Sequence, residues 1–215
     1  MKTLDQYILI LMLLLMPVVA TACSHDASDK QPTTAPVTVE TPKFPPMPSQ
    51  PTGSAFIVVS KRDMTLSVYD RNTVGDTIMA AQFPCCMGKN KGDKVKRGDM
   101  RTPESPADRP FKITMIQDAS DWHHDFSDGR GSILAYGHWF LRLATPGHKG
   151  IGIHGSTNNE GTVPGRASEG CIRLLDKDII TLKEHFAYVG MPVIVQPEDA
   201  TPLPWEQRAR QRSTR

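Results

Sequence analysis

Beyond its N-terminal segment, the sequence contains no long apolar run, no internal repeat and no stripe of basic residues interleaved with aromatics. These absences argue against a multi-span membrane protein and against a nucleic-acid-binding protein. The four cysteines form no Cys-x-x-Cys pair, and the seven histidines form no His-x-x-x-His pair. We therefore expect neither a zinc ribbon nor a helical metal site.

The composition describes an ordinary globular protein. With 215 residues, 39% hydrophobic residues and a formal net charge of +2, the chain can form one domain with a real core and some additional segments.

The N-terminus has the pattern of an export signal. Lys2 precedes the apolar run Tyr7–Val19, and the small residues of ATAC lead to Cys23. This pattern predicts a signal peptide over residues 1–22. ATAC also resembles a bacterial lipobox, which implies lipidation of Cys23 and attachment to the periplasmic face of a membrane. The alternative is ordinary cleavage nearby, which would leave a soluble periplasmic protein with Cys23 as a free thiol.

Composition divides the rest of the chain into three parts. Residues 23–52 are rich in proline and threonine and predict an extended, poorly ordered linker. Residues 53–198 carry the globular pattern and form the predicted folded domain. Residues 199–215 form a basic C-terminal tail, which we expect to be a solvated extension.

The globular part is rich in strand patterns. Alternating or β-branched runs bounded by turn residues predict strands, and the apolar spacing after Asp176, a candidate N-cap, predicts a helix. We therefore expect a mainly β, sandwich-like or barrel-like fold with one main helix. The expected strands are 55–60, 64–70, 77–88, 111–117, 138–144, 150–155 and 191–196, and the expected helix is 176–189.

One stretch, IHGSTNNEGTVPGRASEGCIRL, carries candidate chemistry. His154 ends an apolar strand, and Cys171 follows Gly170, which allows a tight turn. A nearby imidazole can activate a thiol for nucleophilic attack. An odd number of cysteines would remain after lipidation of Cys23, which points to a free thiol. From the residues alone, a catalytic pair and a buried thiol beside an unrelated histidine are about equally supported.

The same stretch resembles the signature of the L,D-transpeptidase catalytic domain, also called YkuD-like. His-Gly, a spacer and Ser-x-Gly-Cys-aliphatic-Arg stand in the family's order, and the upstream segments GDKVKRGDMRTPES and FIVVSKRDMTLSVYD are also similar. The resemblance covers roughly residues 54–196. It implies a β-sandwich-like catalytic domain.

The resemblance also implies roles for single residues. Cys171 would be the nucleophile and His154 the general base, with the amides around Gly170 and Cys171 as an oxyanion hole. Arg173 would shape the site or bind a substrate carboxylate. Ser168 and Gly155 are further site-shaping positions, and Tyr136, Trp139 and Glu169 are candidates for the substrate groove.

Glu169 is a departure, because many family members have histidine at this position. A carboxylate there would oppose thiolate formation unless it faces away or pairs with a cation.

The implied activity is transfer of a peptidoglycan stem peptide. Cys171 would attack a tetrapeptide stem, release D-alanine and pass the acyl group to an amine, giving 3→3 cross-links in cell wall biogenesis and cell shape. The resemblance implies acylation by carbapenems and no metal or organic cofactor. Alternatives are an L,D-carboxypeptidase or amidase, a non-catalytic wall-binding module, and attachment of a protein to the wall. The sequence does not reveal an oligomeric state.

Overall fold

The computed structural model describes residues 44–213. The predictions for the signal peptide, for Cys23 and for most of the linker fall outside these residues. None of the helices within the described range is both long enough and apolar enough to cross a membrane.

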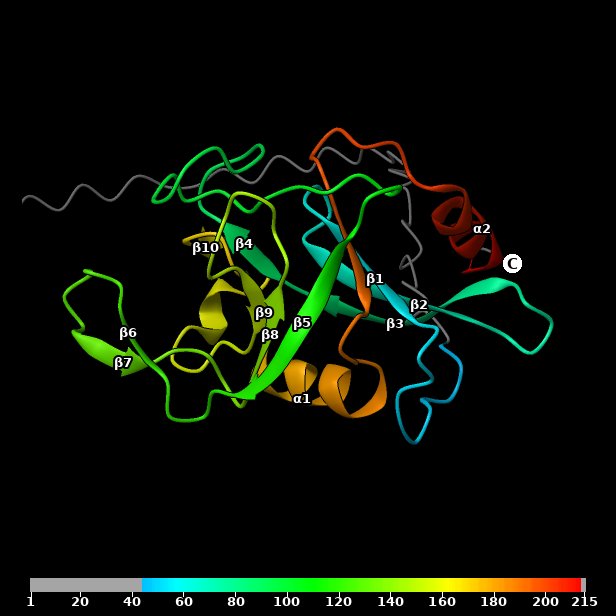
Figure 1. Ribbon diagram of the computed structural model, residues 1–215, viewed down its shortest axis with the longest axis horizontal. Coiled ribbons are helices and arrows are strands. Elements are labelled where there is room, and N and C mark those ends of the chain that lie inside the picture. Colours follow the sequence, from blue (N-terminus) through cyan, green and yellow to red (C-terminus); the bar gives the residue numbers. More distant parts are fainter. Residues whose placement is uncertain (1–43, 214–215) are drawn as a thin grey trace, which may run out of the picture. The chain divides into compact units, whose positions relative to one another are not determined.

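A large mixed sheet dominates the domain and confirms the mainly β prediction (Figure 1). Its strand order is β10-β4-β11-β9-β8-β5-β12-β1-β2-β3, and β6 and β7 form a separate hairpin. The strands are β1 (Phe56–Ser60), β2 (Thr65–Arg71), β3 (Thr77–Pro84), β4 (Cys86–Gly88), β5 (Phe111–Asp118), β6 (His123–Asp125), β7 (Ser132–Leu134), β8 (Trp139–Leu143), β9 (Gly152–His154), β10 (Gly165–Ser168), β11 (Ile172–Arg173) and β12 (Pro192–Gln196).

Strand β5 joins two halves of the sheet. Its start pairs with β12 of the first half, and the rest pairs with β8 of the second half. Ile57 and Leu66 from the first half share one buried cluster with Ile153 and Ile172 from the second. The two halves therefore fold over a common core, as in a sandwich, because both apolar faces must be removed from water.

The helix predicted at 176–189 is α1, Asp176–His185. Its Ile179 and Leu182 belong to the shared core, and the helix is followed by a buried Phe186. The N-cap is Leu175, which makes no side-chain cap bond, so the prediction of Asp176 as the N-cap is wrong. Asp176 is instead the first helical residue, and its carboxylate faces the functional site.

One predicted strand, 77–88, is divided in two. Strand β3 ends at Pro84, the chain turns at the buried Cys85, and β4 begins at Cys86. The two pieces lie in opposite halves of the sheet. Proline lacks the N–H that a continuous strand would need, which explains the break. Cys85 and Cys86 are free thiols and fully buried, as expected for small core side chains.

The C-terminal segment is not a solvated extension. Pro204–Ser213 forms helix α2. Besides α1 and α2, the described residues contain a short 3-10 turn, η1 (Glu160–Thr162). Trp205 packs edge-on against Phe56, and the buried Glu206 accepts hydrogen bonds from Leu203 N and Gln196 Nε2 at 2.6 and 2.7 Å. This helix covers the second face of β1, β2 and β12, which is why Val58, Tyr69 and Ile194 are buried.

Candidate active site

Two neighbouring strands bring the predicted pair together. Strand β11 pairs in parallel with β9, with Arg173 opposite His154. Cys171 directly precedes β11, and His154 is the last residue of β9. Both residues line one cavity of about 290 Å³. Strand ends within a packed sheet are rigid, so the backbone holds the two side chains in a fixed relation.

His154 is held in one tautomer. Its Nδ1 lies 2.7 Å from the carbonyl oxygen of Gly155, which can only accept, so Nδ1 carries the hydrogen and Nε2 carries the lone pair. The ring is only 3% exposed and stacks on Phe140 at 5.6 Å, with Tyr136 at 4.8 Å. Burial, reinforced by the positive charge of Arg173, lowers the pKa of His154 to about 3. The imidazole is therefore neutral at neutral pH and can accept a proton.

Asp176 fixes the turn that follows His154. Its carboxylate accepts a hydrogen bond from Ser156 N at 2.7 Å and another from the Thr157 hydroxyl. A Cβ at Gly155 would lie 2.3 Å from the carboxylate and 2.8 Å from Gly137 Cα. Gly155, one of the predicted site-shaping positions, is thus required by close packing.

Cys171 is a half-buried thiol in the resting protein. Its sulfur lies 3.4 Å from the Gly150 carbonyl, to which the S–H donates. Burial raises the pKa of Cys171, and this effect outweighs the opposing hydrogen bond from Gly152 N–H and the charges of Arg173 and Lys94. The resting pair therefore consists of a neutral thiol and a neutral imidazole.

The turn from Ser168 to Cys171 is closed by its own hydrogen bonds. The Ser168 hydroxyl donates to Cys171 O at 2.6 Å and accepts from Gly170 N at 3.1 Å. Gly170 has φ +136°, and a Cβ there would lie 2.7 Å from Arg101 O, so only glycine fits. Because its N–H is already bonded to Ser168, Gly170 is not a free oxyanion donor in this structure, unlike our expectation.

Arg173 is a buried cation without a carboxylate partner. Arg173 is 3% exposed, and its guanidinium lies 4.9 Å from the centre of the Phe126 ring. Within the described residues its Nε has no hydrogen-bond partner and no ion pair involves it. Because an unpaired buried charge is costly, this arrangement favours binding of an anionic ligand group in the cavity.

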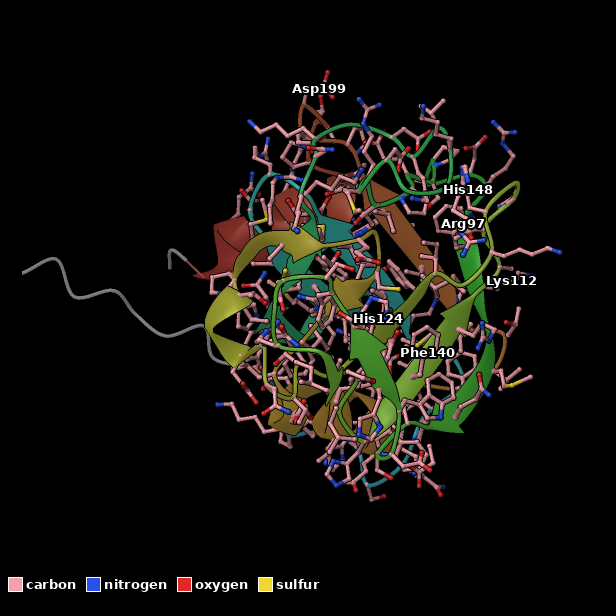
Figure 2. All side chains as sticks on the ribbon, turned by 90° about the vertical axis from the view of Figure 1, so that its left-hand side faces the viewer. Arg97, Lys112, His124, Phe140, His148 and Asp199 are labelled. Carbon is pink, nitrogen blue, oxygen red and sulfur yellow. The ribbon has the colours of Figure 1, made fainter. Side chains whose placement is uncertain are left out.

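Glu169 points to the cavity mouth. Its carboxylate lies 3.4 Å from Nε2 of His124, on strand β6, and the two side chains are 44% and 31% exposed. Figure 2 views the molecule from the side of the β6–β7 hairpin and labels His124. The carboxylate is among the influences that raise the pKa of Cys171, but it is the smallest of them.

The two aromatic groove candidates differ in position. Tyr136 lines the cavity, and its pKa is raised by burial first and then by the neighbouring acidic groups Cys171 and Glu169. Trp139 does not line it. The Trp139 ring instead lies under Lys183 of α1, with the ammonium 4.4 Å from its centre, and packs on the main core.

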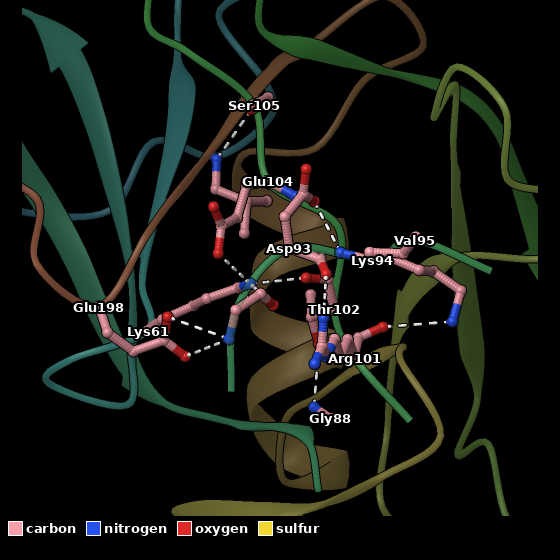
Figure 3. A network of polar contacts seen from close by, with 12 residues as sticks. Lys61, Gly88, Asp93, Lys94, Val95, Arg101, Thr102, Glu104, Ser105 and Glu198 are labelled. Atoms are coloured by element: carbon pink, nitrogen blue, oxygen red, sulfur yellow. Dashed lines mark hydrogen bonds and ion pairs between the residues drawn. The ribbon is translucent and has the colours of Figure 1, made fainter. Parts of the chain in front are cut away.

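A loop over residues 89–104 forms a basic wall of the cavity, and the sequence patterns gave no sign of this arrangement. The buried Lys61 ammonium anchors its base by donating to Gly92 O, Thr102 O and Glu104 Oε1 at 2.9, 2.6 and 2.7 Å (Figure 3). Lys94 and Arg97 from this loop line the cavity.

Asp99 holds the tip of the same loop. It accepts hydrogen bonds from Lys94 Nζ and from the backbone N–H groups of Val95, Lys96 and Arg101. Burial opposes ionisation of Asp99, but these bonds outweigh it and hold its pKa well below the usual range. These bonds fix the conformation of the wall.

A thiol and an oriented neutral imidazole in one cavity are the parts that cysteine acyl-transfer enzymes use. The model of the L,D-transpeptidase catalytic domain family matches residues 54–195. The chain belongs to this family. A comparison with curated proteins gives no match.

Several solved structures resemble the chain at low identity. They include Bd1075 from Bdellovibrio bacteriovorus (20% identity, TM-score 0.48, covering 78% of this chain and 58% of that chain). An L,D-transpeptidase from Mycobacterium smegmatis has 21% identity, a TM-score of 0.45 and coverage of 66% and 58%. The helical cell shape determining protein Pgp2 from Campylobacter jejuni has 20% identity, a TM-score of 0.48 and coverage of 73% and 52%. The chain thus spans little more than half the length of these three.

Proposed function

We propose that the protein is a peptidoglycan L,D-transpeptidase with Cys171 as its nucleophile and His154 as its base. The main supporting observation is the bond from His154 Nδ1 to the Gly155 carbonyl in the cavity that Cys171 lines. This bond leaves Nε2 as the only ring atom able to accept the thiol proton.

Acylation begins from the neutral pair. The Cys171 proton passes to His154 Nε2 as the sulfur bonds to the carbonyl carbon of the third residue of a tetrapeptide stem. The tetrahedral intermediate then collapses, and the bond to the terminal D-alanine nitrogen breaks. His154 returns the proton to the departing amine, which leaves a thioester on Cys171 and a neutral imidazole.

Transfer reverses these proton movements. An uncharged side-chain amine from a neighbouring stem attacks the thioester carbon, and His154 takes one proton from its nitrogen. The carbon–sulfur bond breaks, and the sulfur recovers the proton. The products are a 3→3 cross-link and the free enzyme.

The charges of the cavity favour a donor that carries carboxylates. Arg173, which has no ion pair within the described residues, lies beside the proposed catalytic pair, and Arg97 adds positive charge from the loop 89–104. A bidentate contact from Arg173 to a carboxylate would satisfy the guanidinium.

Hydrolysis of the same thioester is the second candidate function. Cys171 is half-buried, and Glu169 at the cavity mouth is exposed, so water can reach the acyl group. Resolution by water would give an L,D-carboxypeptidase.

Defined muropeptides distinguish the two functions. The purified full-length protein is incubated with a tetrapeptide donor, and the products are measured by mass spectrometry. Cross-linked dimers would support transpeptidation, and tripeptides alone would support hydrolysis. If wild type and Cys171→Ala both leave the donor intact, the enzymatic proposal fails. A meropenem adduct in the intact mass, absent in Cys171→Ala, tests the nucleophile separately.

We also propose a periplasmic lipoprotein anchored at Cys23, on the basis of the lipobox-like ATAC segment. A thioether-linked diacyl group plus an amide-linked chain would hold the protein firmly to the membrane, whereas one chain alone binds marginally. Labelling with palmitate in cells should mark the wild type and not Cys23→Ala. Equal labelling of both would refute the anchor.

A further inference from the structure

The cavity around Cys171 contains an unequal set of charges. Four of its lining side chains are the cations Lys94, Arg97, Lys149 and Arg173, whereas Glu169 is the one carboxylate that lines it within the described residues. Lys94 is paired with Asp99, but Arg97, Lys149 and Arg173 repel an acceptor amine, which carries a positive charge at neutral pH. Glu169 is the lining group that can attract it.

Glu169 is free to bind a cation. Its side chain is 44% exposed, and its contact to His124 Nε2, at 3.4 Å, joins only Oε2. That distance exceeds the 2.7–2.9 Å typical of a strong charge-assisted hydrogen bond. Within the described residues, no hydrogen bond or ion pair involves Oε1, so this carboxylate oxygen is available to a ligand cation.

The position of Glu169 is fixed relative to the nucleophile. Glu169 stands inside the turn that the Ser168 hydroxyl closes by bonding to Gly170 N and Cys171 O. Glu169 stands two residues before Cys171 in the chain, and both residues line the same cavity. A carboxylate here works against thiolate formation, so it does not assist acylation.

We propose that Glu169 forms an acceptor subsite, in which its carboxylate binds the ammonium of an incoming primary amine. This inference rests on the proposed transpeptidase function and names the group that selects an amine over water. Binding concentrates the amine beside the thioester, and the fraction that has lost a proton to the solvent attacks.

The measured quantity is the ratio of aminolysis to hydrolysis per acyl-enzyme, which is independent of how fast the acyl-enzyme forms. For Glu169→Gln we expect this ratio to fall about two- to fivefold with a diamino-acid stem as acceptor, the range that a partly exposed ion pair supports. Glu169→Lys should lower the ratio further, because it adds repulsion. Glu184→Gln, which removes an exposed charge on α1 outside the cavity, is the matched control and should match wild type.

An uncharged nucleophile separates charge recognition from a general disturbance of the site. Hydroxylamine is neutral at neutral pH, so its ratio to hydrolysis should be the same in wild type, Glu169→Gln and Glu184→Gln. Equal amine ratios in these three proteins would overturn the acceptor subsite. An equal loss with hydroxylamine in Glu169→Gln would also overturn it.

The same experiment separates the two levels of the proposal. If wild type forms a thioester and cross-linked product but the amine ratio is insensitive to Glu169, only the acceptor subsite fails. If wild type forms no thioester on Cys171, the proposed function fails and the subsite with it. A wild-type thioester that yields only tripeptide would make the protein a hydrolase and refute the subsite.

Discussion

Replacing Lys61 with methionine should strongly destabilise the domain. The Lys61 side chain is 1% exposed, and its ammonium donates to two carbonyls and to the carboxylate of Glu104. Methionine fills a similar volume but leaves the two carbonyls and the 19% exposed carboxylate without their donor. Removing one partner of a buried ion pair costs about 3–5 kcal/mol, so we expect the free energy of unfolding to fall by about that amount.

Urea unfolding followed by tryptophan fluorescence measures this change, provided the transition slope stays constant. Arg62→Met is the matched control, because Arg62 is an exposed neighbour whose pair with Asp63 is 44% and 38% exposed. We expect the control to change stability by less than about 0.5 kcal/mol. The double variant Lys61→Met/Glu104→Gln should recover part of the loss, since it removes the unpaired charge. A loss below about 1 kcal/mol in Lys61→Met would refute this reasoning.

Three further predictions follow from other contacts. Asp176→Asn should lower the free energy of unfolding by about 1.5–3 kcal/mol, because Ser156 N and the Thr157 hydroxyl lose a charged acceptor. The same change should slow acylation by meropenem, and an unchanged acylation rate in stopped-flow traces would contradict this role of Asp176. Between pH values of about 3 and 6.5, His154 binds a proton in the unfolded chain but not in the folded one, so the free energy of unfolding should rise with pH over this range. In a pH series of melting curves, a melting temperature that rises as steeply in His154→Phe as in wild type would rule this out. Trp205→Ala should cost about 1–3 kcal/mol in chemical denaturation, and no change would mean that α2 does not stabilise the sheet.

Local patterns single out His154 and Cys171, and the resemblance to the family signature makes them the predicted catalytic pair. His154 ends a short apolar strand and Cys171 follows a glycine turn, so each position carries its own sequence pattern. Their meeting depends on the parallel pairing of β9 and β11, which no local pattern encodes. Asp176 was misinterpreted for the same reason. An acidic residue before a helix usually caps it, and only tertiary contacts reveal that its carboxylate holds the turn after His154.

The elements that were missed are short or polar. The β6–β7 hairpin consists of two three-residue strands with histidine, aspartate and serine, so its alternation is too brief to distinguish from a loop. Helix α2 was missed because its three arginines resemble a solvated tail, while the partly buried Trp205 and the buried Glu206 stand at its start. A tryptophan in an otherwise polar segment was the sequence feature that could have indicated a packed helix.

The neutral resting state of Cys171 affects how fast this thiol is oxidised. Peroxides and disulfides react with the thiolate form of cysteine, and burial keeps Cys171 protonated until substrate chemistry removes its proton. We therefore expect slow sulfenic acid formation in dilute hydrogen peroxide, measured by dimedone labelling, compared with a small-molecule thiol at the same pH. The nucleophile proposed for this protein would thus be protected from oxidation between turnovers.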